Sequence, residues 1–396
     1  MMKYIIFSFC IVLIYPLGVD LHLTGLTAIA RDLQATEATL HMAFSIYLIG
    51  MASTMLIAGW CSDHFGRKPI ALLGTVVFML ASLQSGFSIT ENSFLIARFF
   101  QGIGAGFCYV VTFSILRDTL IEQQRAKILS MLNGITCIVP VLAPVLGYLI
   151  LLRFEWPTMF FFMAGYALIN FVFCLFGIKE TKQKIDPNKK FTPDLVKMSS
   201  VNESLLNPLF LSRLLISCLG MGVILTYVNI SPIVIMQQMN YTTGQYSTVM
   251  TLLSLVSMTT SFLMPKILSK FSYSTILYTG LMIFFCAALF LLLGLVQENY
   301  WFFIAFALCG AGFALLFGII MSQALSPFSQ RAGLASSVLA IAQLSFASLY
   351  IWIMGWIGIP AVTMLIIILL ASSVIGFTLL RFFSSLNQSQ EVVSNA

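Results

Sequence analysis

Charged residues are scarce in this sequence. Only 9% of its 396 residues are Asp, Glu, Lys or Arg, against about 25% in an average soluble domain. Hydrophobic residues make up 59%, more than a soluble protein of this length could bury. A bilayer removes that problem because its interior is itself apolar, so the composition indicates a membrane protein. The net charge of +6 is spread thinly, which excludes the concentrated basic surface of a nucleic-acid-binding protein.

The sequence also lacks the spacing of a metal site or a disulfide framework. None of its eight Cys forms a CxxC pair, and seven lie inside apolar runs, where they are expected to pack as small apolar residues. His22, His41 and His64 are scattered without ligand spacing. No nucleophile motif or His/Asp pair is present. We therefore expect no metal, no cofactor and no enzyme activity, which argues against a membrane-bound acyl or glycosyl transferase.

Long apolar runs fill most of the chain. A transmembrane helix needs roughly 20 apolar residues, and twelve segments qualify. The first begins after Lys3 as a signal peptide would, but no small-residue cleavage pattern follows it, so we expect an uncleaved helix. The expected spans are 4–21, 40–60, 69–87, 94–116, 128–152, 156–178, 209–235, 246–265, 274–296, 300–325, 332–353 and 358–382.

The distribution of Lys and Arg predicts the orientation. With the N-terminus in the cytoplasm, 17 of the 20 Lys and Arg lie on the cytoplasmic side. Arg31 and Arg153 then lie outside, and Arg98 falls within a span. The reverse orientation would violate the positive-inside rule almost everywhere. Both termini are therefore expected in the cytoplasm of a multi-pass inner-membrane protein.

Two halves of the sequence repeat at an offset of 206 residues. Residues 101–107 (QGIGAGF) resemble 307–313 (ALCGAGF), and 124–126 align with 330–332. Chance similarity of glycine-rich helices is the alternative, but the shared offset argues against it. An all-helical transporter with two six-helix bundles has its binding site between them. The expected units are a first bundle, a cytoplasmic linker, a second bundle and a disordered tail, at residues 1–178, 179–208, 209–383 and 384–396.

Asp20 and Arg98 are the two ionisable residues expected inside spans, where such residues usually have a function. Both are expected in the outer part of the bilayer, because Asp20 lies about 25 Å of helix rise beyond Lys3. They could face one another or share a water-filled cavity. Burial raises the pKa of a carboxyl group and a guanidinium lowers it, so an acid placed there could exchange protons, whereas arginine stays charged. The alternatives are a helix-end Asp20 and an Arg98 that reaches the membrane surface.

The strongest local motif is GWCSDHFGRKP at 59–69, expected as the loop between the second and third spans. Asp63 and Arg67 are spaced to form a charge cluster, which Asp118 at the inner end of the fourth span could join. Glycines permit a tight turn and close helix approach. The preference of basic residues for the cytoplasmic side would by itself explain Arg67 and Lys68 but not Asp63. The candidate residues of this motif, together with its expected partner Asp118, are Gly59, Asp63, Gly66, Arg67 and Lys68.

This motif resembles the signature of the major facilitator superfamily. Residues 98–106 (RFFQGIGAG) are similar to that family's fourth-helix motif, and Asn133-Gly134 with 140–147 (PVLAPVLG) resembles its fifth-helix antiporter motif. Lys179-Glu180-Thr181 resembles its closing sequence after the sixth helix. The first-helix segment 15–21 (YPLGVDL) is similar to the drug:proton antiporters with twelve spans.

The resemblance implies alternating access with proton antiport. By match, Asp20 is the protonation site and Arg98 is the cavity arginine that tunes it. The cluster of Asp63, Arg67 and Asp118 would latch the cytoplasmic side while the outer side is open.

The helix-five motif would bend that helix. After Asn133 and Gly134, Pro140 and Pro144 would kink it and Gly147 would let it pack closely against the second half. The alternative is the ordinary tolerance of membrane helices for proline.

The sequence departs from some relatives in its acids. No second acid precedes Asp20 in the first helix, and 265–275 in the second half lacks the acid and the Gly-Arg pair of the loop motif. One proton site is therefore expected rather than two, which favours neutral or monocationic lipophilic substrates. An apolar, aromatic cavity would suit them. Its expected lining is Phe44, Tyr47, Tyr109, Phe113, Tyr227 and Asn229, each of which could instead be a packing residue.

The sequence thus predicts a proton-coupled multidrug efflux transporter that confers antibiotic resistance. Its expected partners are lipophilic compounds, with amphenicol-type antibiotics among the candidates, together with protons and the lipid bilayer, and a monomer suffices. The alternative is an exporter of a metabolite such as a sugar or siderophore, which would need a more polar cavity. A proton symporter that imports a nutrient is disfavoured by the helix-five motif.

Overall fold

The computed structural model describes residues 2–120, 128, 138–181, 204–296, 300–328 and 332–394. Every regular element in these ranges is a helix. Eleven helices in this part of the chain are long and apolar enough to cross a membrane, and Val139–Leu151 is a shorter apolar helix. The described helices match the twelve expected spans in order. Most of the N-terminal part of the fifth span, residues 129–137, lies outside the described ranges.

The first span is built from four short helical pieces. They are α1 (Met2–Val12), α2 (Ile14–Asp20), the 3₁₀ segment η1 (Leu21–Gly25) and α3 (Leu26–Asp32), so this span reaches further than the expected 4–21. The other first-half helices are α4 (Glu37–Phe65), α5 (Arg67–Gly86), α6 (Glu91–Thr119), α8 (Val139–Leu151) and α9 (Pro157–Val172), which continues as the π-helix η2 (Phe173–Gly177).

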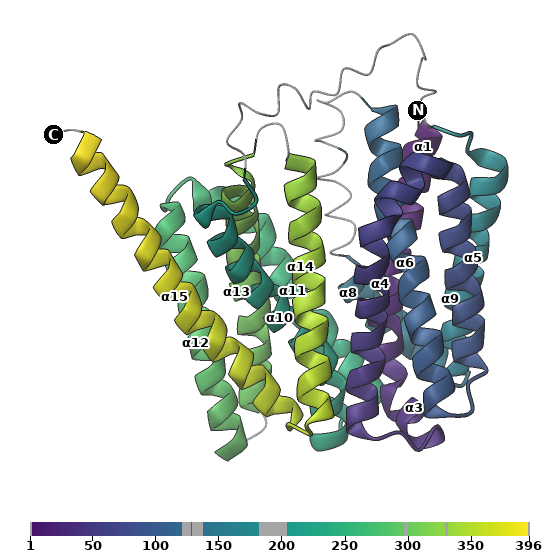
Figure 1. The fold of residues 1–396 in the computed structure, drawn as a ribbon. Coiled ribbons are helices and arrows are strands. Elements are labelled where there is room, and N and C mark those ends of the chain that lie inside the picture. The colour runs from purple at the N-terminus through teal and green to yellow at the C-terminus, as the bar shows by residue number, and fades with distance from the viewer. Residues whose placement is uncertain are drawn as a thin grey trace, which may run out of the picture.

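The second half repeats this plan with longer uninterrupted helices. They are α10 (Pro208–Pro232) with the π-helix η4 (Ile233–Gln238), α11 (Thr243–Leu268), α12 (Tyr273–Val296), α13 (Tyr300–Leu325), α14 (Ala332–Trp356) and α15 (Ala361–Ser394). In Figure 1 the two halves stand side by side, and both chain ends lie at the same end of the molecule. Each half has its own large hydrophobic core.

Local sequence signals explain where several helices begin. Thr36 caps α4 and Thr90 caps α6, each through a side-chain oxygen that accepts a backbone N–H three residues later at 3.2 Å. Thr242 and Gln245 form a reciprocal capping box at the start of α11. Pro157 and Pro208 open α9 and α10, where a missing N–H costs nothing.

Glycines of α6 and α13 let neighbouring helices touch backbone to backbone. Gly104 lies on the backbone of Gly74 and Phe78 of α5, and Gly312 lies on the carbonyl of Gly280 and the ring of Phe284 of α12. By its packing, Gly104 therefore corresponds to Gly312, whereas the sequence repeat with an offset of 206 residues aligns Gly104 with Gly310. The two halves share one plan, but in this helix the sequence alignment and the packing differ by two residues.

Two expected boundaries are wrong. Residues 59–65 belong to α4 rather than to a loop, because this segment has no Pro and Gly59 alone does not end the helix. The connection to α5 is Gly66 alone. At the other end, α15 continues to Ser394, where a disordered tail was expected from residue 384. Residues 383–394 contain no Gly or Pro, so nothing in their sequence ends the helix that the span has started.

The most extensive contacts between the two halves are made by two helix pairs. α4 packs against α14, and α8 packs against α11. At the beginning of α11, Gly244 lies on the ring of Tyr148 near the end of α8. Gly355 near the end of α14 lies on His41 near the beginning of α4. These contacts sit at the end of the bundle that is remote from the two termini (Figure 1).

Candidate functional site

The first span changes helix type at its buried acid, Asp20. Pro16 lies within α2, and the α-helix gives way to the 3₁₀ turn of η1 immediately after Asp20. A 3₁₀ stretch in the middle of a long helix often marks a hinge. Asp20 is 8% exposed, and within the described residues its carboxylate makes no hydrogen bond or ion pair. The break therefore holds an unpaired acid inside a membrane span.

Tyrosines from both halves lie in the neighbourhood of Asp20. The side chains of Tyr15 on α2, Tyr47 on α4, Tyr227 on α10 and Tyr246 on α11 lie within electrostatic range of its carboxylate. Their hydroxyls are directed elsewhere: Tyr47 donates to the carbonyl of Tyr15 at 3.0 Å, and Tyr246 pairs with Ser231. Asp20 therefore lies where the two halves meet.

Arg98 is completely buried and does not pair with Asp20. Its Nη1 donates to the carbonyl of Gly18 at 3.0 Å and to Oε1 of Gln101, and its Nε reaches the carbonyl of Ala43 at 3.4 Å. The guanidinium carbon also lies 4.5 Å from the ring centre of Tyr47, in a cation–π contact. Gln101 passes the network on to α5 by donating to Ser82 at 2.8 Å.

Asp20 and Arg98 were expected to face one another or to share a water-filled cavity. The structure shows no direct contact between them, and Arg98 does not reach the membrane surface; the shared cavity stays a prediction. Arg98 instead holds the backbone of α2 at Gly18, two residues before Asp20. The guanidinium thus fixes the helix that carries the acid from inside the first half. The reach of Arg98 to two main-chain carbonyls could not be seen in the sequence, because carbonyl positions depend on how the helices pack.

The expected charge cluster is present where the ends of α4, α5 and α6 adjoin. Arg67 bridges Asp63 of α4 at 2.9 Å and Asp118 of α6, and its Nη1 donates to the carbonyl of Ser62 at 2.8 Å. Arg117 adds weaker contacts to both acids. Arg67 is 6% exposed and the side chain of Asp118 is 12% exposed, so their contact is shielded from water, whereas Asp63 and Arg117 are more than half exposed. Arg117 was not predicted as part of the cluster, although it is next to Asp118 in the sequence.

Glu180 completes the turn between α4 and α5. Its carboxylate accepts the backbone N–H groups of Arg67 at 2.9 Å and Lys68 at 3.1 Å, at the N-terminus of α5, where a negative charge is favoured. Lys68 in turn donates to the carbonyl of Leu175 at 2.7 Å. Gly66 has φ +107°, and a Cβ there would meet Glu180. Gly59, by contrast, lies in mid-helix with open space beside it, so the close approach expected there is absent.

The helix-five prolines free a carbonyl for the second half. Pro144 has no N–H, so the carbonyl of Pro140 has no partner in its own helix. Ser254 of α11 donates to that carbonyl at 3.2 Å, and Thr251 donates to the carbonyl of Val141 at 3.3 Å.

Gly147 faces a different helix from the one expected. A Cβ at this position would meet Thr24 and the carbonyl of Leu21 in η1, so the glycine packs α8 against the first span rather than against the second half. Asn133 and Gly134, the remaining residues of this motif, lie outside the described ranges.

The expected cavity residues divide into packed and partly open side chains. Tyr47 and Phe44 are buried in the first core, and Tyr227 packs on Phe306 with ring centres 5.1 Å apart. Tyr109 and Phe113 are half-buried and form an edge-to-face row with Tyr15. Tyr15 was not among the expected lining residues, although it lies one turn before Asp20 on the same helix.

Asn229 is a cross-half hydrogen-bonding residue rather than an open lining residue. Its side chain lies 2.7 Å from Nδ1 of His41, and both side chains are 1% exposed. His22 is also fully buried, beside Phe160, and its ring nitrogens lie near the carbonyls of Gly18 and Val19 without making a hydrogen bond. The positions of His22 and His41 could not be predicted from the sequence, because neither residue lies in a recognisable motif.

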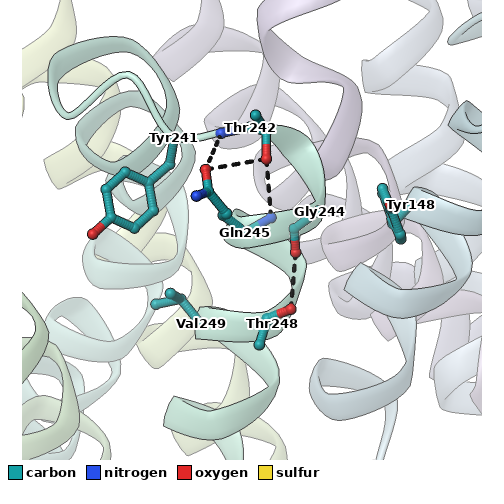
Figure 2. A pocket seen from close by; sticks show the side chains of 7 residues that line it. All are labelled: Tyr148, Tyr241, Thr242, Gly244, Gln245, Thr248 and Val249. Carbon is teal, nitrogen blue, oxygen red and sulfur yellow. Dashed lines mark hydrogen bonds between the residues drawn. The ribbon is translucent and has the colours of Figure 1, made fainter.

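An open groove of about 450 Å³ lies between the ends of α8 and α11. Figure 2 shows Tyr148 of α8 facing the first turns of α11, with the capping pair Thr242 and Gln245 on the opposite wall. The other lining residues are Tyr241, Gly244, Thr248 and Val249. None of the expected substrate residues lines this groove, so it is separate from the site around Asp20.

Comparison with known proteins agrees with this architecture. Residues 8–350 match the Major Facilitator Superfamily. Among solved structures, the D-xylose-proton symporter has a TM-score of 0.76 at 15% identity, over 96% of this chain and 97% of that one. A bacterial homolog of the human lysosomal transporter Spinster has a TM-score of 0.73 at 13% identity, over 96% and 98%. At this identity the likeness shows the fold alone.

Curated relatives are much more similar in sequence. The multidrug resistance protein MdtL of Vibrio parahaemolyticus is 49% identical over 96% of this chain and 95% of its own. MdtL of Klebsiella pneumoniae is 48% identical with the same coverage. The expected resemblance to the drug exporters of the superfamily is thereby confirmed over nearly the whole length. Family match, fold and relatives agree that the chain belongs to the Major Facilitator Superfamily.

Proposed function

We propose that this chain exports lipophilic drug-like compounds in exchange for protons, as a multi-pass protein of the bacterial inner membrane. The relatives that carry the name multidrug resistance protein support drugs as the substrate class. The transporter family and these relatives favour transport over catalysis. The observation that carries the proton-coupling proposal is Asp20, a shielded acid without a cationic partner at the meeting point of the two halves.

Asp20 is the proton carrier in this proposal. A carboxylate held away from water with no salt bridge is costly unless it is neutralised, and a proton or a cationic substrate can neutralise it. Arg98 cannot carry the proton because it stays charged; it positions α2 through the carbonyl of Gly18. Proton binding from outside then favours drug release, and proton loss to the cytoplasm lets the next drug bind.

The substrate lies against aromatic rings. The row of Tyr15, Tyr109 and Phe113 offers partly exposed ring faces beside the broken helix, which suits flat lipophilic molecules. Polar side chains that a sugar would require are engaged elsewhere: Gln101 binds Arg98 and Asn229 binds His41. We therefore favour neutral or monocationic lipophilic substrates, including amphenicol-type antibiotics, over sugars or siderophores.

The halves exchange access by rocking around this site. The contacts between Gly244 and Tyr148 and between His41 and Gly355 close the end remote from the termini. With both termini in the cytoplasm, as the distribution of Lys and Arg predicts, that end is the outer one. The structure then corresponds to a form closed on the outside, and the Arg67 cluster ties the inner ends of the first half. A monomer suffices for this cycle.

Transport into everted vesicles tests the proposal. One proton moving across 100 mV supplies about 2.3 kcal/mol, enough for a substrate gradient of about 1.6 decades. Uptake of a lipophilic antibiotic should follow an imposed pH gradient in the native protein and should be lost in Asp20→Asn. The matched control is Asp32→Asn, the same change at the exposed end of the first span, which should transport normally. Undiminished proton-driven uptake by Asp20→Asn would rule the mechanism out.

A further inference from the structure

The groove between α8 and α11 has one wall from each half. Tyr148 of α8 forms the first-half wall, and residues 241–249 at the beginning of α11 supply the other lining residues. The groove continues a contact that runs along the same helix pair, where Thr251 and Ser254 of α11 donate to carbonyls of α8. Its volume of about 450 Å³ is in the range of pockets that hold drug-sized molecules. A small molecule bound there would touch both halves at once.

The second-half wall presents an amide whose orientation is fixed. The backbone N–H of Thr242 donates to Oε1 of Gln245 at 2.8 Å, and the hydroxyl of Thr242 donates to the same oxygen at 3.1 Å (Figure 2). A backbone N–H can only donate, so the atom that it meets must be the amide oxygen. Nε2 of Gln245 therefore keeps both of its hydrogens, and neither has a partner among the described residues.

The other polar groups of the lining are engaged hydroxyls and free hydroxyls. Thr248 donates its hydroxyl hydrogen to the carbonyl of Gly244 at 3.0 Å. The hydroxyls of Tyr148 and Tyr241 make no hydrogen bond within the described ranges, although the ring of Tyr241 is held against Phe303 with ring centres 5.7 Å apart. The seven lining residues include no charged side chain. The groove thus combines aromatic rings with free donors and no charge.

These features define the chemistry of a molecule that would fit. A cation would face the two hydrogens of Gln245 Nε2 without any counter-charge in the lining, which is unfavourable. A carbonyl, amide or nitro oxygen would instead accept those hydrogens. An aromatic ring would pack against the ring of Tyr148, in the way that aromatic pairs stabilise each other. The lining therefore suits a neutral aromatic compound that carries a hydrogen-bond acceptor.

We propose that this groove binds neutral aromatic compounds that carry a hydrogen-bond acceptor, and that a bound compound keeps the outer side closed. Tyr148 and Gln245 belong to different halves, so one molecule can contact both only while the halves are together at this end. A ligand shifts a conformational equilibrium by the difference between its affinities for the two states. The proposal rests on the proposed function, because alternating access and the orientation define the outer side.

Neutral and cationic substrates then differ in their effect from outside. A neutral aromatic compound that accumulates on the outer side occupies the groove and slows export, including its own. A monocationic compound is exported without this inhibition, because the groove offers it no counter-charge. The site around Asp20, by contrast, has an acid that can accept either class.

Photolabelling of the purified full-length chain tests the site. The probe is p-benzoylbenzamide, a neutral compound with two rings and an amide, which reacts with nearby residues under light. Label should appear in the peptide that carries Tyr148 and in the peptide that carries residues 241–249. The cationic analogue p-benzoylbenzylamine should label these two peptides about tenfold less, because burying its charge beside a donor is unfavourable.

Gln245→Glu separates recognition from a merely structural role. A carboxylate oxygen can still accept the N–H of Thr242, since Glu and Gln both complete a capping box, but the two amide hydrogens are replaced by a negative charge. The preference should therefore reverse, with labelling by the amide falling about tenfold and labelling by the amine rising. Thr248→Val lies in the same groove and removes a hydroxyl that is already engaged, so it should leave both labels unchanged.

Cysteine accessibility measures the effect of the bound compound on the outer side. Leu40 at the beginning of α4 is 3% exposed and packs in the core of the second half, so Leu40→Cys should react with an impermeant maleimide only when the outer side is open. In right-side-out vesicles kept in the dark, p-benzoylbenzamide should lower this reaction severalfold, and Gln245→Glu should abolish the effect. The parent chain without Leu40→Cys gives the background from native cysteines.

Three results would overturn the proposal. Equal labelling by the amide and the amine, or a preference that survives Gln245→Glu, would show that the groove does not recognise this class of compound. A faster reaction of Leu40→Cys in the presence of the amide would show that the bound compound opens the outer side. Repeating the photolabelling in Asp20→Asn keeps the two proposals apart, because the groove should be labelled there even if Asp20 carries no proton.

Discussion

In the first half, Arg67 ties the adjoining ends of α4, α5 and α6 through two acids, whereas among the described residues the matching connection in the second half has no such cluster. There α11 ends at Leu268 between exposed Lys266 and Lys270. Buried charge follows the same division. Among the described residues, the buried acids, arginines and histidines are Asp20, His22, His41, Arg67, Arg98 and Arg213, and all but Arg213 belong to the first half.

The two halves nevertheless pack alike. Gly104 and Gly312 make matching contacts on the neighbouring helix, so the difference is one of chemistry and not of architecture. A repeated fold can keep its packing while one copy loses ionisable groups, because packing depends on small residues and the proton site on a few side chains. We infer that the first half handles the proton and that the second half supplies the facing wall.

The largest expected contrast lies between the buried arginines of the two halves. Arg98→Ala removes the donor for Gly18, Ala43 and Gln101, a loss of about 3 kcal/mol or more. Arg213 makes one hydrogen bond, from Nε to Gln323 at 2.7 Å, so Arg213→Ala should cost only about 1 kcal/mol. Export and thermal unfolding of the detergent-solubilised variants would measure both, and equal losses would contradict the asymmetry.

Arg98→Lys sharpens this contrast. It keeps the charge but not the fork that reaches two carbonyls and an amide at once. Export should therefore remain impaired at least tenfold even where the folded protein is recovered in normal amounts. Full activity of Arg98→Lys would show that charge alone is required, and that the hold on Gly18 is dispensable.

The two glycines of the loop motif should respond in opposite directions. Gly66→Ala forces a side chain into a positive-φ conformation and toward Glu180, which should destabilise the protein by about 1–3 kcal/mol. Gly59→Ala fills open space in mid-helix and should stabilise slightly, by up to about 1 kcal/mol. Thermal unfolding of the pair provides its own matched control. Destabilisation by Gly59→Ala would mean that the motif needs both glycines for a shared reason.

The smallest expected effect lies at the contact between the halves on helix five. Ser254→Ala removes the donor to the carbonyl that Pro144 leaves free, at a cost of about 1 kcal/mol. Thr259→Ala on the same helix removes a hydroxyl bonded within its own helix and serves as the control. A change in transport rate confined to Ser254→Ala would support a role of this contact in the transport cycle. Equal rates in both variants would exclude that role.

Much of the fold could be predicted from the sequence, because span length and charge distribution are properties of single segments. The contact of Asp63, Arg67 and Asp118 was also predictable, since the first two residues are one helical turn apart and the third lies at a matching depth. The partners of Arg98 were not, because its acceptors are main-chain carbonyls of α2 and α4.

The same reason explains the other differences. Gly147 faces η1, and Asn229 faces His41, and both facts depend on how helices rotate about their axes. Rotation follows from the packing of all neighbours at once, which a single sequence does not display.

Drug-induced proton release tests the central claim most directly. The purified native protein, held in weakly buffered detergent solution, should release protons when a lipophilic substrate binds, because the substrate displaces the proton from Asp20. Asp20→Asn should release none while still binding the compound, and Asp32→Asn should behave as the native protein. Proton release of native size from Asp20→Asn would place the proton elsewhere and contradict the account.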